Sequence, residues 1–255
     1  MENFVVSYDV YTIVYISVMC FMGAFIDATV GGGGLITVPA FMSLGWPIPC
    51  ALGTNKAAAA VSLGTSAINY WRAGKTDPFI YNYIPLIALS AAAGAYAVYV
   101  IPTDIMQYLV VFFLIAVAIY TFFHKNLGDQ GARPLHKHFN LYTIITCIVI
   151  GFYDGFFGPG DGAFLIFIFI YLGCDFIKAA GNAKVINCAA CIGALIYFGI
   201  NGAIVWQYAL ISIPSMIAGA ITGSSFALKK GVAFIRPLFM VIVVIMIAKQ
   251  IYNLF

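Results

Sequence analysis

The sequence predicts an all-α polytopic membrane protein, because of its composition and the length of its apolar runs. Of its 255 residues, 63% are hydrophobic and only 8% are charged, whereas a soluble domain carries about 25% charged residues. The mean hydropathy is +1.01. The apolar runs are long and continuous, while the strands of an outer-membrane barrel alternate in polarity over segments of about 10 residues. Membrane-spanning helices are therefore favoured over a soluble domain or a barrel.

The first apolar run, residues 11–30, is predicted to be a transmembrane helix rather than a cleavable signal sequence. Glu2 and Asp9 precede it, and no Lys or Arg does, whereas a signal peptide begins with a basic region. We also expect no soluble domain that such a peptide could deliver.

The remaining runs predict a series of five helical elements that occurs twice, before and after a polar loop at residues 124–139. A helix needs about 20 residues to cross the hydrocarbon core. The second element, residues 35–45, is therefore expected to be a short, broken helix that does not cross alone. The predicted helices are residues 11–30, 35–45, 51–72, 79–100 and 103–123, followed by 140–157, 162–173, 176–199, 204–228 and 232–253.

Individual residues recur between the two series as well. Asp27 recurs as Asp154 and Lys56 as Lys184, at offsets of 127 and 128 residues, and each Asp precedes a glycine cluster. Self-similarity over half of a chain indicates a duplication. The predicted organisation is a first transmembrane repeat at residues 1–127, a cytoplasmic linker loop at 128–139 and a second transmembrane repeat at 140–255.

Loop charges predict that the two repeats have opposite orientations. Lys and Arg concentrate in cytoplasmic loops. In the first repeat they follow the third helix, whereas the equivalent loop of the second repeat, near Asn201, has none. This pattern is an inverted-topology repeat with both termini periplasmic, typical of carriers whose halves rock about a central site. The residues that mark cytoplasmic loops are Arg72, Lys75, Lys125, Arg133, Lys137, Lys229, Lys230 and Arg236.

Five charged residues lie within or beside the apolar segments. Each costs roughly 2.5–3.5 kcal/mol at the bilayer centre, so each is expected to face a cavity or a partner. In one interpretation the lysines supply positive charge to a small anion, and the aspartates accept N–H bonds, form ion pairs or carry protons. In the other, the Asp and Lys of each repeat pair with each other and only staple the broken helices. The five residues are Asp27, Lys56, Asp154, Asp161 and Lys184.

Two glycine clusters, residues 31–34 and 158–162, interrupt the apolar segments at equivalent places. Glycine adopts positive φ and lets a ligand approach the backbone, and the helix that follows begins with unpaired N–H groups. Such helix ends bind anions. The alternative is that these glycines only allow close helix packing, as small residues do in membranes. The glycine cluster occurs twice, each time near a lysine embedded in apolar sequence, and this favours an anion site.

These motifs resemble those of a known family. Gly23-Ala-Phe-Ile-Asp-Ala-Thr-Val-Gly-Gly-Gly-Gly-Leu-Ile-Thr-Val-Pro39 and Ala51-Leu-Gly-Thr-Asn-Lys56 resemble the first motif of the TauE/SafE sulfite-exporter family, in its YfcA-like branch. The second half is similar to that family's second motif over residues 151–162 and 183–187. The resemblance covers almost the whole chain. Asp161 departs from it, since a small neutral residue is expected between those glycines.

The resemblance implies a transporter of the bacterial inner membrane that exports or exchanges a small oxyanion, such as sulfite or an organosulfonate. We predict that the anion is held between the repeats, and that the interior-negative potential favours anion exit by about 2.3 kcal/mol per charge per 100 mV. Asp27, Asp154 and Asp161 are assigned to proton coupling or structural ion pairs. The predicted ligands are Lys56, Lys184, Thr54, Asn55, Asn182 and Asn187, with backbone amides of Gly33, Gly34, Gly160 and Gly162.

Two rival functions stay open: a passive anion channel with the same lining, and a cysteine-assisted thiosulfate importer. The importer requires Cys50, Cys174, Cys188 or Cys191 along the pathway. An enzyme is not expected, since the three histidines lie in or next to the central loop and no catalytic motif is present. A lone CxxC at Cys188 is a weak metal signal. The lipid bilayer and a small anion are the expected partners, without cofactor, metal or nucleic acid, and a homodimer is left open.

Overall fold

The computed structural model describes residues 9–102, 105–106, 108–109, 112, 115–116 and 136–230. The predicted helix at 232–253, most of the predicted helix at 103–123 and most of the loop at 124–139 lie outside the described residues. Within the described part, every regular element is a helix. The predicted all-α class is therefore confirmed.

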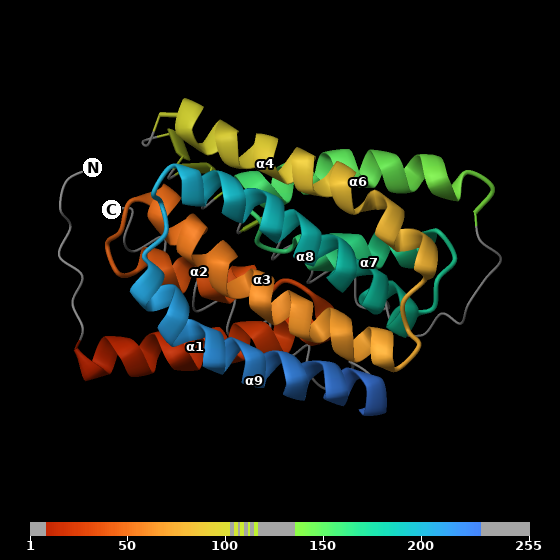
Figure 1. Cartoon of the computed structure of the whole chain (residues 1–255), viewed down its shortest axis with the longest axis horizontal. Coiled ribbons are helices and arrows are strands. Elements are labelled where there is room, and N and C mark those ends of the chain that lie inside the picture. Colours follow the sequence, from red (N-terminus) through yellow and green to blue (C-terminus); the bar gives the residue numbers. More distant parts are fainter. Residues whose placement is uncertain are drawn as a thin grey trace.

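The predicted helices occur in the expected order, and their ends differ from the predicted ones by a few residues. The second and seventh elements are short, as expected. With the labels of Figure 1, the elements are α1 (Val10–Val30), α2 (Gly34–Met42), α3 (Ile48–Arg72), the 3₁₀ helix η1 (Pro78–Tyr83), α4 (Ile84–Val100), α6 (Phe139–Phe156), α7 (Asp161–Tyr171), α8 (Phe176–Ile200) and α9 (Trp206–Lys230).

One predicted helix, residues 79–100, is divided into η1 and α4. Proline explains the division. Pro85 lies in the first turn of α4, where its missing N–H leaves no bond unmade. The same missing N–H prevents a continuous helical ladder from η1, so the chain enters α4 through a separate 3₁₀ turn.

Two buried glycine turns end α1 and begin α7. Gly31 adopts a φ of 78°, and its N–H donates to the Asp27 carbonyl oxygen at 3.1 Å, which closes the last turn of α1. Gly160 adopts a φ of 88° immediately before α7. Positive φ is unfavourable for residues with a Cβ, so glycine is required at both places. Each turn reverses the chain from a long helix into a short one, α2 or α7.

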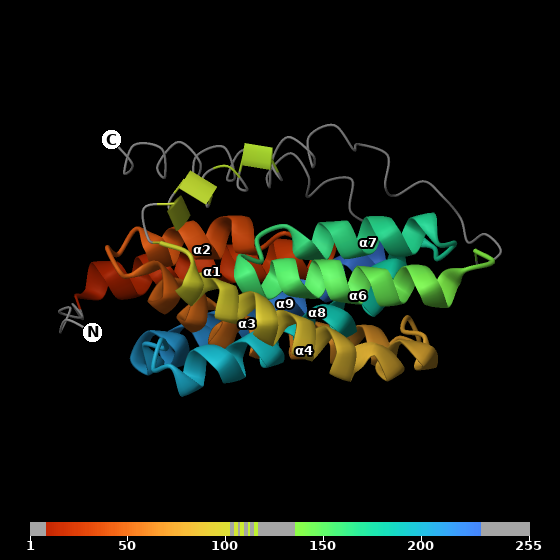
Figure 2. The ribbon, with the colours of Figure 1, turned by 90° about the horizontal axis from the view of Figure 1, so that it is seen from above.

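The helices form a bundle in which α3 and α8 lie between two outer pairs, α1 with α9 and α4 with α6 (Figure 1). Figure 2 shows α2 and α7 end to end in one layer. The colours of Figure 1 show that α1 and α6 run in opposite directions, as do α3 and α8.

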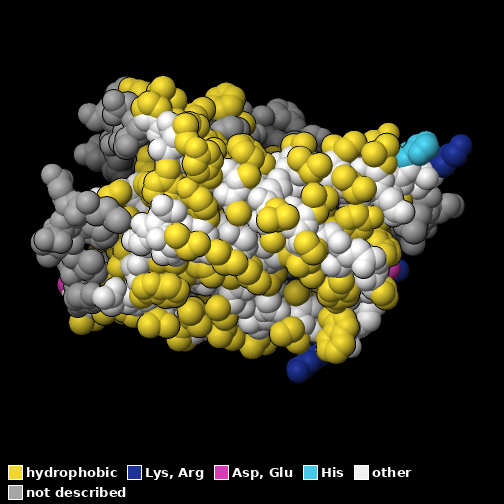
Figure 3. All heavy atoms as spheres, turned by 45° about the horizontal axis from the view of Figure 1, so that its top comes forward, with side chains coloured by type: hydrophobic (Ala, Val, Ile, Leu, Met, Phe, Trp, Pro, Cys, Tyr) yellow, Lys and Arg dark blue, Asp and Glu magenta, His cyan; other side chains and the backbone are white. Residues whose placement is uncertain are grey.

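Five helical segments of the described chain are long and apolar enough to cross a membrane: α1, η1 with α4, α6, α8 and α9. Hydrophobic side chains dominate the face drawn in Figure 3, where charged side chains stand at the edges of the view. The chain is thus a multi-pass α-helical membrane protein. Helix α3 has 25 residues but is less apolar, because it lies inside the bundle and contributes polar side chains to the interior.

Glycines bring the outer helices into close contact. A Cβ on Gly155 of α6 would lie 1.8 Å from the Ala91 carbonyl oxygen of α4, and a Cβ on Gly94 would lie 2.0 Å from the Phe152 carbonyl oxygen. Helices α1 and α9 make similarly close backbone contacts at Gly219 and Gly223 of α9. Helices in lipid gain their association from such close packing rather than from water exclusion.

We expect Gly155→Ala to lower the free energy of unfolding by about 1–3 kcal/mol, because the added methyl group overlaps the α4 backbone. Thermal unfolding of the purified protein in detergent measures the effect. Gly199→Ala is the matched control: its Cβ would make an ordinary 3.5 Å contact with the Ile204 side chain. Equal stability of the two variants would contradict this account of the α4–α6 contact.

Candidate functional site

A buried cavity lies where the two short helices meet the long ones. Its volume is about 40 Å³, which is room for about three water molecules at ~10–15 Å³ each. Helices α1, α2, α3, α6, α7, α8 and α9 or the turns between them all contribute to its wall. The predicted site residues that line it are Asp27, Gly33, Gly34, Asn55, Lys56, Asp154, Asp161 and Asn187.

The amino-terminal ends of α2 and α7 meet beside this cavity. A Cβ on Gly34, the first residue of α2, would lie 3.0 Å from the Pro159 Cα, and one on Gly31 would lie 2.3 Å from the Ala163 N. The glycine turns of the two halves thus touch backbone to backbone. Two helix ends that carry partial positive charge therefore converge on one place. Side chains larger than hydrogen would separate them.

Two buried ion pairs join the halves crosswise. The Lys56 ammonium of α3 donates to the Asp154 carboxylate of α6. The Lys184 ammonium of α8 donates to the Asp27 carboxylate of α1 at 3.1 Å. The alternative in which Asp27 pairs with Lys56 and Asp154 with Lys184 is therefore wrong: each lysine takes its partner from the other half. Antiparallel α3 and α8 carry each lysine toward the opposite glycine turn.

Asp27 serves two partners at once. Its Oδ2 accepts from Lys184, and its Oδ1 accepts from the Gly33 N–H at 3.1 Å. That N–H belongs to the turn just before α2, where backbone donors lack helical partners. One carboxylate thereby fixes the start of α2 and neutralises a lysine that is fully buried.

Gly158 makes room for the other ion pair. It adopts a φ of 92°, and a Cβ there would lie 2.7 Å from the Lys56 Nζ and 3.0 Å from an Asp154 carboxylate oxygen. The turn is held from the side by the Tyr153 hydroxyl, which donates to the Pro159 carbonyl oxygen at 2.7 Å. The glycine cluster at 158–162 therefore packs directly on the charged groups.

Two buried oxygen atoms at the cavity have no hydrogen-bond partner among the described residues: Asn55 Oδ1 and Asp161 Oδ2. Their residues are only 5% and 6% exposed. Buried polar atoms in native proteins are nearly always satisfied, so an unpaired one at a cavity wall indicates a place for a ligand, water or proton. Asp161 stands in the first turn of α7, where the helix dipole favours negative charge.

Two other predicted ligands, Thr54 and Asn182, have structural partners away from the cavity. Thr54 Oγ1 accepts from the Val205 N–H at 3.0 Å, ahead of α9. The Asn182 side chain bonds both the backbone N–H and the carboxylate of Asp77. Lys184 does not line the cavity, and its contact with the cavity wall is the ion pair with Asp27. Gly160 lies in the turn immediately before α7, and Gly162, the second residue of α7, lies against Gly31.

The cavity also includes residues that the predicted ligand set omitted. Cys191 Sγ lies 3.9 Å from both the Lys56 Nζ and the Asp154 Oδ2, and 3.8 Å from the Asn187 Oδ1. Helical spacing could have indicated Cys191 from the sequence. Asn187 and Cys191 follow Lys184 by three and seven residues, so all three share one face of α8. Thr37, Ser62 and Met216 complete the wall from α2, α3 and α9.

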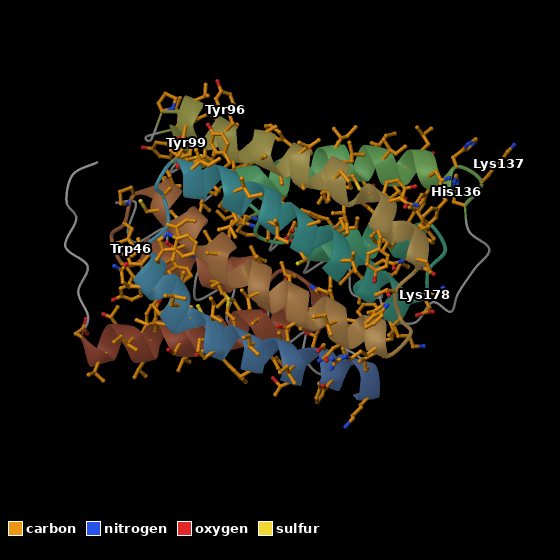
Figure 4. The ribbon with its side chains drawn as sticks, viewed as in Figure 1. Trp46, Tyr96, Tyr99, His136, Lys137 and Lys178 are labelled. Carbon is orange, nitrogen blue, oxygen red and sulfur yellow. The ribbon has the colours of Figure 1, made fainter. Side chains whose placement is uncertain are left out.

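The ends of the bundle differ in character. Figure 4 places His136, Lys137 and Lys178 at one end and the aromatic residues Trp46 and Tyr99 at the other. Lys178 pairs with Asp77 at 2.6 Å, and 40% of its side chain is exposed. The charged residues at the cavity, such as Lys56 and Asp154, are buried, unlike the partly exposed Lys178 at the end of the bundle. No group of three potential metal ligands occurs among residues whose placement is described.

The short helices α2 and α7 lie beside buried charges in a bundle of membrane-spanning helices. This arrangement is typical of multi-pass α-helical membrane transporters, which bind their substrates where helices are interrupted. Residues 15–250 match the sulfite exporter TauE/SafE family. The chain belongs to the TauE/SafE family and is a membrane transporter rather than an enzyme. The family resemblance seen in the sequence motifs is thereby confirmed.

Relatives cover nearly the whole chain. A Sinorhizobium protein named probable membrane transporter protein ORF9 is 34% identical over 89% of this chain and 88% of its own length. A probable membrane transporter protein of Haemophilus influenzae is 32% identical over 91% and 92%. The probable membrane transporter protein YfcA of Escherichia coli K12 is 30% identical over 91% and 87%. No solved structure matches.

The crossed pairs predict which second substitution rescues the loss of a lysine. Lys56→Met is expected to cost about 3–5 kcal/mol of stability, because it leaves the Asp154 carboxylate buried without its partner. Adding Asp154→Asn should recover part of that loss, whereas adding Asp27→Asn should not, since Asp27 pairs with Lys184. Thermal unfolding in detergent measures all three variants. Rescue by Asp27→Asn instead would contradict the crosswise arrangement.

Proposed function

We propose that this chain is a secondary transporter of the bacterial inner membrane that exports or exchanges a small oxyanion by alternating access. The observation that carries the proposal is the convergence of two helix amino termini on one small cavity that Lys56 lines and that the buried Lys184 approaches through its ion pair with Asp27. Both features favour negatively charged ligands. The name of the matching family, sulfite exporter, supports a sulfur-containing oxyanion as the substrate.

An inverted repeat supports the alternating-access part of the proposal. Helices α1, α2, α3 and α4 have counterparts of similar order in α6, α7, α8 and α9, and the counterparts run in opposite directions (Figure 1). The cavity lies at the contact between the two sets. Rocking one set against the other exposes such a site to one face of the membrane at a time.

The distribution of charge supports an orientation. In Figure 4 the carboxyl-terminal ends of α3 and α9 lie at the same end of the bundle as Lys137 and Lys178. By the positive-inside rule that end is cytoplasmic. The first described residue, Asp9, precedes α1 at the opposite end, so we place the amino terminus in the periplasm.

Charge-neutral double variants separate the transport role of the lysines from their structural role. In Lys56→Met/Asp154→Asn and Lys184→Met/Asp27→Asn, the ion pair is removed as a unit, so stability is retained better than in the single variants. Transport should nevertheless fall by about tenfold or more in each, because a charge-assisted contact to the anion is worth about 1.5–3 kcal/mol. Lys56 lines the cavity and can make such a contact directly, whereas the Lys184–Asp27 pair acts through Asp27, which holds the turn before α2. Uptake of radiolabelled sulfite into proteoliposomes measures this.

Lys178→Ala is the matched control for these variants, since that lysine is partly exposed and pairs with Asp77 away from the cavity. It should transport at nearly the unaltered rate. Wild-type rates in both double variants would remove the lysines from the substrate site and leave them with a structural role alone.

A second candidate function is supported by one observation. Cys191 lies at the cavity, beside Lys56 and Asp154, which is the position that a cysteine-assisted thiosulfate importer requires. Cys188 faces away, with its thiol directed to the Ala60 carbonyl oxygen at 3.6 Å. Of these two cysteines, the relevant one is therefore Cys191.

Under the oxyanion proposal, Cys191→Ser should alter sulfite transport by less than about twofold, because a buried thiol then acts only as a small packing group. Under the importer alternative, thiosulfate transport is abolished by the same change. Parallel flux measurements with sulfite and thiosulfate, with Cys188→Ser as the control, decide between the two.

A further inference from the structure

The charged groups of the site leave no positive charge free for an anion. Lys56 is bound to Asp154 and Lys184 to Asp27, and Asp161 adds a third carboxyl group to the same cavity wall. Two lysines against three aspartates give a net charge of −1 when all five are ionised. Entry of a monovalent anion would raise the buried charge to −2. Uncompensated buried charge is costly, so a further positive charge must arrive with the anion.

Hydrogen bonding leads to the same requirement by a separate route. The unpartnered atoms at the cavity, Asp161 Oδ2 and Asn55 Oδ1, are both oxygen acceptors. The oxygens of sulfite or a sulfonate also only accept, so a bare anion satisfies neither atom. A proton on Asp161 Oδ2 converts that acceptor into an O–H donor, which can bond to the anion or to Asn55. One proton on Asp161 therefore neutralises the excess negative charge and also supplies the hydrogen-bond donor that the cavity lacks.

We propose that the anion binds together with one proton, and that Asp161 carries this proton at the carboxyl oxygen that faces the cavity. The step takes one proton from water and forms one O–H bond on Asp161, so a monovalent anion and its proton cross as an electroneutral pair. This inference rests on the proposed oxyanion transport. It also changes the energetics: the membrane potential no longer drives the loaded step, and the anion and pH gradients together set its direction.

The groups that face Asp161 support it as the proton carrier. Asp154 of α6 and Asp27 of α1 each set a negative charge against Asp161. Lys56 of α3 is the opposing positive charge, but it is already bound to Asp154. The thiol of Cys191 on α8 and the phenol of Tyr153 on α6 also interact with Asp161.

Asp154 and Asp27 are less suited to the role. Each already accepts from a lysine, and a proton on either would break a buried ion pair. Breaking such a pair costs about 3–5 kcal/mol, whereas protonation of Asp161 breaks none. Asp161 is therefore the carboxyl group that can change its charge while the two halves stay joined.

Anion affinity as a function of pH tests the proposal. Titration calorimetry of the full chain in detergent would measure binding of sulfite, sulfate and methanesulfonate from about pH 6 to about pH 9, in amine buffers because sulfonate buffers compete for the site. Methanesulfonate stays a monoanion throughout, so any pH dependence belongs to the protein. We expect its affinity to fall by about tenfold per pH unit on the alkaline side, which is the slope of one linked proton.

The variant Asp161→Asn should bind methanesulfonate with an affinity that is flat over the same range, since its amide is a permanent donor without charge. Asp175→Asn is the matched control: its side chain caps α8 away from the cavity, and Asn caps equally well, so the slope should persist. A flat profile in the unaltered protein, or an unchanged slope in Asp161→Asn, would overturn the inference alone. Binding of none of the three anions at any pH would remove the proposed transport function with it.

Discussion

The two crossed ion pairs are the constraint on which the rest of this structure depends. A charged side chain in lipid has no water to stabilise it, so it needs an opposite charge at contact distance. Lys56 finds that charge in Asp154, and Lys184 finds it in Asp27. Each pair reaches across the chain's two halves, so the halves must be docked for either lysine to be neutralised. Helix breaks, glycine turns and the position of α3 and α8 all serve this docking.

The glycines follow from the same constraint. Lys56 and Asp154 occupy the space that a side chain at residue 158 would need, and the turn at Gly31 lies on the backbone of Gly162 and Ala163. Farther out, Gly155 and Gly94 bring α6 and α4 together by the same principle. Small residues thus act at two levels: they bring the outer helices close and they leave the site open enough for a small ligand.

Much of this arrangement could be predicted from the sequence, and the reasons for success and failure are physical. Apolar runs and proline or glycine breaks define helices locally, so the ends of α1 and α8 were predicted to within one residue and those of α2 and α7 to within three. The duplicated Asp and Lys indicated the site. Pairing could not be predicted in the same way, because it depends on how the halves dock: Lys56 bonds to a carboxylate almost a hundred positions away. Thr54 and Asn182 look like ligands in the motif, yet their neighbours in space turn them to Val205 and Asp77.

The crosswise arrangement also has a consequence for biosynthesis. When the ribosome has delivered α1 to α4, Asp27 and Lys56 are already in the membrane, but their partners on α8 and α6 have not yet been made. The nascent first half must therefore hold two unmatched charges in contact with the translocation machinery or with water until the second half is inserted. A prematurely terminated chain would leave both charges without their partners, at a cost of several kcal/mol in lipid.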